Sequence, residues 1–84
     1  MSTQTRPLFT IAADIRKTWV NKKGDPSVNY AAKPYLEAME MLNRITDSYF
    51  ADDADSIVRY FLSNATSWRG PDARRVKAEL KAML

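Results

Sequence analysis

Trp68 and Arg69 form an aromatic–cation pair directly before a short helical pattern rich in positive charge. Four further cations follow within one or two helical turns, at Arg74, Arg75, Lys77 and Lys81. Such cations can bind phosphates, and a helix N-terminus adds backbone N–H donors. One hypothesis is therefore a nucleic-acid-binding helix that uses Arg69, Arg74, Arg75, Lys77 and Lys81. Asp72 and Glu79 on the same helix work against it, and "TSWRGP" is longer than the usual helix-turn-helix turn.

The chain also carries many aromatic residues for its length, at 11% of 84 residues. Most of them should pack in or over the core. Trp, Tyr and Arg dominate the energetic centres of protein interfaces, so any of them left outside is a natural anchor for a partner. We take Trp68, Arg69, Tyr30 and Tyr49 as the candidate partner-binding residues, with Trp68 and Arg69 first.

The sequence contains few residues that could support catalysis or bind a metal. It contains no Cys and no His, which removes disulfides, thiolate nucleophiles, the commonest general base and the commonest transition-metal ligand. No Ser lies in a nucleophile elbow, and two glycines do not make a phosphate-binding loop. The acidic run from Asp47 lacks the spacing of a calcium loop, because its twelfth position is Val58. We predict no enzymatic activity, no cofactor and no metal.

Helical spacing of apolar residues runs through almost the whole chain. It predicts helices over about 8–20, over 53–65 and over 71–83. A further helix starts between 31 and 34, because Pro34 fits only a first turn, and its buried stripe continues to Ile45. Asn29 could cap this helix, and Asp52 and Asp53 could cap the next.

These elements indicate an all-α fold, a compact irregular bundle of about four short helices. We expect a single domain over residues 1–84, with residues 1–6 flexible. Charge is segregated along it: 1–33 and 57–84 each carry a net +4, and 34–56 carry −5. This layout can be self-complementary, or it can leave a polarised surface that steers a charged partner.

The chain shows neither a signal-peptide pattern in its first ten residues nor an apolar run of membrane-spanning length. We therefore expect a cytoplasmic protein that does not contact the membrane.

Three stretches give the chain a family likeness: "IRKTW" (15–19), "YAAKPYLEAM" (30–39) and "SIVRYFLSNATSWRGPDARRVKAELKAML" (56–84). Together they cover about half of it, and they resemble small accessory proteins encoded by tailed bacteriophages. That group has no settled activity, so no residue role is carried over. The resemblance implies a non-virion protein that acts in the bacterial host cytoplasm, commonly by binding a host protein.

The leading hypothesis from the sequence is thus a non-enzymatic, phage-type accessory protein that binds a host protein or itself, including as a homodimer. The alternative is a small nucleic-acid-binding domain that uses the basic face of the last helix. A third is a virion or assembly component whose function is oligomerisation.

Overall fold

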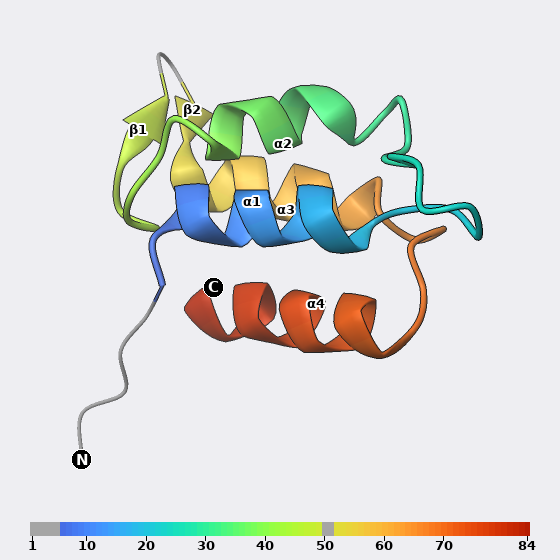
Figure 1. The fold of residues 1–84 in the computed structure, drawn as a ribbon. Helices are drawn as coiled ribbons and strands as arrows, with labels where there is room; N and C mark the ends of the chain where they lie inside the picture. Colours follow the sequence, from blue (N-terminus) through green and yellow to red (C-terminus); the bar gives the residue numbers. More distant parts are fainter. Residues whose placement is uncertain (1–5, 50–51) are drawn as a thin grey trace.

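The structure is a computed structural model that describes residues 6–49 and 52–84. Most of these residues lie in helices (Figure 1). The described part contains four helices and a two-stranded antiparallel sheet, and 53% of it is helical. The elements in chain order are α1 Leu8–Thr18, α2 Lys33–Met39, β1 Ser48–Tyr49, β2 Asp52–Asp53, α3 Ala54–Ser63 and α4 Pro71–Met83. The prediction of four short helices is confirmed, whereas a purely all-α fold is wrong because of the β1–β2 ribbon.

The core lies inside a ring of four helices. α1 packs against α2 and α4, and α3 packs against the same two helices from the other side. Figure 1 shows α2 and α4 on opposite sides of α1. The largest fully buried side chain is Phe61 of α3, and it belongs to a core cluster with aliphatic residues from all four helices. α3 therefore contributes the largest buried side chain of the core.

α2 ends earlier than the apolar spacing predicts. The predicted stripe continues to Ile45, but the helix stops at Met39 and Leu42 reaches the core from a turn. Asp47 gives the physical reason, because its carboxylate accepts the backbone N–H groups of Asn43 (3.1 Å) and Arg44 (2.9 Å). A side chain that takes these donors offers the backbone an alternative to further helix. The same bonds lower the pKa of Asp47.

The β1–β2 ribbon joins this turn to α3. Ser48 pairs with Asp53 and Tyr49 pairs with Asp52, and the Ala54 N–H donates to the Asp47 carbonyl oxygen at 2.8 Å. Asp53 occupies the N-cap position of α3 as predicted, but its side chain makes no capping bond there. Its carboxylate accepts the Ser48 hydroxyl instead, at 3.4 Å.

The segment before α1 is fastened to α4 by charge. Arg6 donates two bonds to Glu79, at 2.9 and 2.6 Å, and one to Asp14 of α1 at 3.1 Å. Arg75 of α4 donates to the same Asp14 at 3.0 Å. Arg6, placed in the predicted flexible segment, is therefore held by two carboxylates. The rest of that segment, residues 1–5, lies outside the described residues.

Within 6–49 and 52–84, every helix is too short or too polar to cross a membrane.

Candidate functional site: a tyrosine-lined groove

Trp68, the first candidate anchor, is a core residue. Only 4% of it is exposed, and its ring stacks on Trp19 with centroids 5.2 Å apart and planes 8° from parallel. Trp19 in turn meets Phe61 edge to face. The prediction that Trp68 is an exposed anchor is therefore wrong, because the end of α1 supplies a flat apolar partner that covers the indole.

The cations predicted around Trp68 divide into two groups. Two of them make contacts within the fold. Arg75 forms ion pairs with Asp14 and Asp72. The Lys77 ammonium donates to the Trp68 carbonyl oxygen at 2.6 Å and lies 5.9 Å from the centroid of the Trp68 ring. Burial lowers the pKa of Lys77, and the nearby charges of Lys81 and Arg69 lower it further. The basic face of α4 is thus smaller than its sequence suggests.

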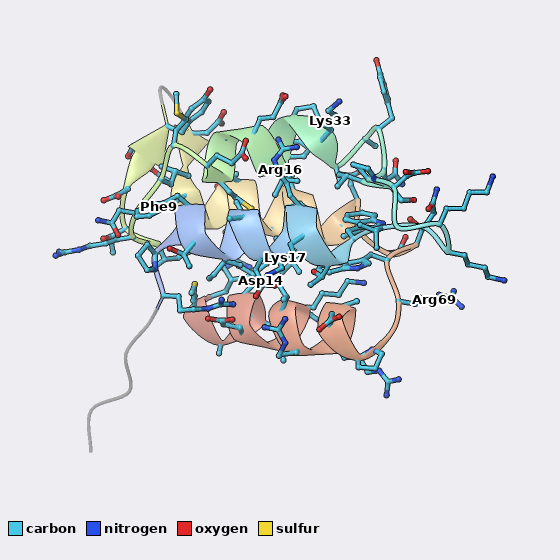
Figure 2. The ribbon with its side chains drawn as sticks, viewed as in Figure 1. Phe9, Asp14, Arg16, Lys17, Lys33 and Arg69 are labelled. Carbon is cyan, nitrogen blue, oxygen red and sulfur yellow. The ribbon has the colours of Figure 1, made fainter. Side chains whose placement is uncertain are left out.

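The other group is exposed and forms no ion pair with a described residue; we call it the free cations, and it consists of Arg69, Arg74 and Lys81. Figure 2 shows Arg69 pointing away from the loop before α4, whereas Asp14 lies between α1 and α4. These three cations are what remains of the predicted nucleic-acid surface.

Tyr30 and Tyr49 line two neighbouring hollows, and residues of α2 line both hollows as well. The first, of about 450 Å³, lies between α2, the ribbon and α3, and is lined by Pro34, Tyr35, Ala38, Tyr49, Asp52, Ile57 and Tyr60. The second, of about 380 Å³, is lined by Tyr30, Ala31, Lys33, Pro34 and Glu37. Pro34 belongs to both, so the two hollows meet at the start of α2. We call their combined surface the tyrosine groove.

Pro34 lines both hollows and so lies between them, and we call this position the Pro34 ridge. On a helix with 3.6 residues per turn, Lys33 and Glu37 lie to one side of Pro34, and Tyr35 and Ala38 lie to the other. Pro34 itself is exposed. A proline is tolerated in this first turn because its missing N–H has no partner to lose, and Asn29 shapes the turn before it by accepting the Ala31 N–H at 2.9 Å.

The groove collects all four tyrosines of the chain, although they come from different segments. Tyr30 is 90% exposed, and Tyr60 is 51% exposed. Tyr35 packs on the core, and its ring lies 5.4 Å from that of Tyr60. Tyr49 also packs against the core from β1. An apolar wall with hydroxyl groups at its surface results.

Sequence reasoning found Tyr30 and Tyr49 but missed Tyr35, Tyr60 and Pro34. The apolar spacing from residue 35 to Ile45 predicts that Tyr35 is buried, and in the structure it packs against the core as a partly buried residue. The sequence carries a signal for Tyr60, because it is an aromatic residue outside the buried face of α3, which consists of Ala54, Ile57, Val58 and Phe61. Trp68 and Arg69 do not join this site. They belong to the loop before α4, at the opposite end of the molecule from the ribbon (Figure 1).

Carboxylates border the groove on both sides of the ridge. Asp52 lies in the first hollow, is exposed and forms no ion pair within the part of the chain that the structure describes. Glu37 lies in the second hollow together with Lys33. Its charge also helps to raise the pKa of Arg16, whose main partner is Glu40 at 2.6 Å. The first hollow therefore has a net negative lining.

No group of three or more carboxylates among residues 6–49 and 52–84 is arranged to hold a metal ion. Comparison of the chain with protein-family models, curated proteins and solved structures finds no match.

Proposed function

We propose that this chain is a non-enzymatic protein-binding protein whose binding surface is the tyrosine groove. The convergence of all four tyrosines on two adjoining hollows is the observation that carries this proposal. Tyrosine is enriched at interface centres because it offers a large rigid ring and a polar tip at low entropic cost. The resemblance to phage accessory proteins adds the setting, a bacterial host cytoplasm, and a host protein or a second copy as the partner.

A photo-crosslinking residue in place of Tyr30 tests this proposal in bacterial cells that make the protein. Tyr30 is almost fully exposed, so the replacement should leave the fold intact. The matched control carries the same residue at Met41, which is 76% exposed and outside the groove. We expect one discrete light-dependent adduct from position 30 and none from position 41. An adduct of twice the 9.6 kDa chain mass would identify a second copy as the partner.

The second change Tyr60→Ala supplies the specificity test. It removes an exposed ring from the first hollow, so a partner that occupies both hollows should bind less and the adduct formed from position 30 should disappear. An adduct that survives Tyr60→Ala, or that forms equally from position 41, would show that the groove is not the binding surface.

The free cations support a second candidate function, nucleic-acid binding. Arg69, Arg74 and Lys81 are exposed and have no described ion-pair partner, and Arg69 points into solvent (Figure 2). Three phosphate contacts would give a modest salt dependence, with a log–log slope of about −3 on duplex DNA. Fluorescence anisotropy of a labelled duplex, with the Arg69→Ala/Arg74→Ala double variant as comparison, measures it. If the affinity for the duplex did not change with salt concentration, or if the double variant bound as tightly as the unaltered chain, the hypothesis of nucleic-acid binding by these cations would be wrong.

A further inference from the structure

We infer that the occupant of the tyrosine groove is an extended, proline-containing segment of a partner protein that carries an arginine or lysine. This inference rests on the proposed function, since it names the chemistry of the partner for the same surface.

The shape of the groove suits a polyproline II helix. Such a helix has three residues per turn and a rise of about 3.1 Å, so side chains three apart recur on one face. The tyrosine groove offers two hollows with the Pro34 ridge between them. Successive turns of the ligand can occupy the two hollows while its backbone crosses the ridge. Aromatic-lined grooves are the usual surface for proline-rich segments.

The polar groups of the groove match what a proline-rich backbone lacks. Proline has no N–H, so such a segment presents carbonyl oxygens that need donors and few donors of its own. The hydroxyl groups of Tyr30 and Tyr60 can supply them, because both residues are at least half exposed and a phenol donates one hydrogen bond. An apolar wall with hydroxyl donors therefore favours this class of ligand over a helix, whose backbone groups are already paired.

The first hollow is also preformed. Its floor contains Ala38 and Ile57, both buried, and its walls are fixed by the Tyr35–Tyr60 ring contact and by Tyr49 in the β1–β2 ribbon. A preorganised site avoids the entropic cost of ordering side chains on binding, and a polyproline II segment brings little disorder of its own.

The charge of the groove selects a cation on the ligand. Asp52 is the charged residue that lines the first hollow, and it is exposed without an ion-pair partner among the described residues. In the second hollow Glu37 is offset by Lys33. Complementarity therefore places the arginine or lysine of the ligand beside Asp52, with prolines across the ridge.

Calorimetric titration of the full chain with capped peptides tests this assignment. The probe is PPPPPRPPPP, and the comparison peptide PPPPPEPPPP differs only in the sign of its charge. We expect saturable binding of the arginine peptide and weaker binding of the glutamate peptide. Tyr30→Ala and Tyr60→Ala should each weaken the arginine peptide about tenfold or more, as for a residue at an interface centre. Asp52→Asn should bring the two peptides to similar affinities, and Met41→Ala should change neither.

Each failure points to a different step. If neither peptide binds while the adduct at position 30 still forms and still depends on Tyr60, the ligand class is wrong and the proposed function stands. If a peptide binds equally to the Tyr30→Ala and Tyr60→Ala variants, the groove is not its site. If both peptides bind the unaltered chain equally, the cation is not selected. Circular dichroism of each variant identifies loss of binding caused by unfolding.

Discussion

At the scale of single residues, several charged side chains hold the fold together. Asp14 is the clearest case, because it accepts bonds from both Arg6 and Arg75 and so ties the N-terminal segment, α1 and α4 to one carboxylate. Glu79 receives the other two bonds of Arg6. Charges that could steer a partner are thereby neutralised within the molecule.

These carboxylates should make stability depend on pH in the acid range. Hydrogen bonds from Arg75 lower the pKa of Asp14, and those from Arg6 lower the pKa of Glu79. A carboxylate whose folded pKa is depressed stabilises the fold above its unfolded pKa, and this contribution disappears as pH falls through the folded value. We expect the free energy of unfolding to fall from about pH 5 downward.

Urea unfolding between pH 7 and pH 3 measures this dependence, with Glu79→Gln as the test variant. The variant should be about 1 kcal/mol less stable at pH 7, since the pair is partly exposed, and should lose less on acidification. Glu37→Gln, on an exposed carboxylate of the groove, is the control and should follow the unaltered chain. If the free energies of unfolding of Glu79→Gln and of the unaltered chain fell by the same amount on acidification, the assigned role of Glu79 would be wrong.

At the scale of elements, Gly70 fixes how the loop enters α4. It has φ +111° and ψ 178°, a conformation that is essentially restricted to glycine, and it is the N-cap residue before Pro71. A Cβ at this position would meet nothing within 4 Å, so the cost of a side chain is backbone strain alone.

Gly70→Ala should therefore destabilise the fold by about 1–3 kcal/mol without a steric clash. Thermal unfolding followed by circular dichroism measures this loss, and Ser67→Ala, exposed in the same loop, should stay within about 0.5 kcal/mol of the unaltered chain. An unchanged midpoint for Gly70→Ala would mean that the loop can enter α4 by another backbone path.

Much of the helical framework could be predicted from the sequence. Period-3.6 apolar stripes and the position of proline place α4 at its observed bounds, and place α1 and α3 within about two residues of theirs. The ribbon could not be predicted in this way, because two-residue strands of Ser, Tyr and Asp show no alternation. The early end of α2 depends on the Asp47 side chain bonding to backbone groups three and four residues before it, which apolar spacing does not register.

The candidate site was only partly predictable, for a reason of the same kind. The exposure of Tyr30 and the burial of Trp68 depend on which surfaces the helices bring together, and Trp68 is covered in part by the ring of Trp19. Tyr35 and Tyr60 lie in different helices, and only the packing of α2 on α3 brings their rings into contact.

Across the molecule, the tyrosine groove and the free cations lie on different elements, the groove on α2, the ribbon and α3, and the cations on α4 and the loop before it. The ribbon, with part of the tyrosine groove, lies at one end, and the loop that carries Arg69 lies at the other (Figure 1). The tyrosine groove and the free cations share no lining residue and no ion-pair partner among the described residues, and substitutions that share no partner usually act independently. Variants in the groove and variants of the free cations should therefore separate the two candidate functions cleanly.

A chain of this size depends on very few core side chains. An 84-residue domain buries only about 60–65% of the surface that its unfolded chain exposes, so its stability lies toward the low end of the usual range. Phe61→Ala should remove about 3–5 kcal/mol and leave much of the chain unfolded at 37 °C. Circular dichroism checks this, with Phe9→Ala, half-exposed on α1, as the milder control. A loss below 1 kcal/mol would show that Phe61 is not the centre of the core.

The stacking of Trp19 on Trp68 gives the protein a built-in optical reporter. These are its only two tryptophans, and the nearly parallel rings 5.2 Å apart should couple their electronic transitions. Unfolding must separate them, so the coupled signal reports the closure of the end of α1 on the loop before α4. The groove contains tyrosines and no tryptophan. A ligand that occupies the groove should therefore change the tyrosine signal, whereas a perturbation that opens the core should change the tryptophan signal, and one sample reports both.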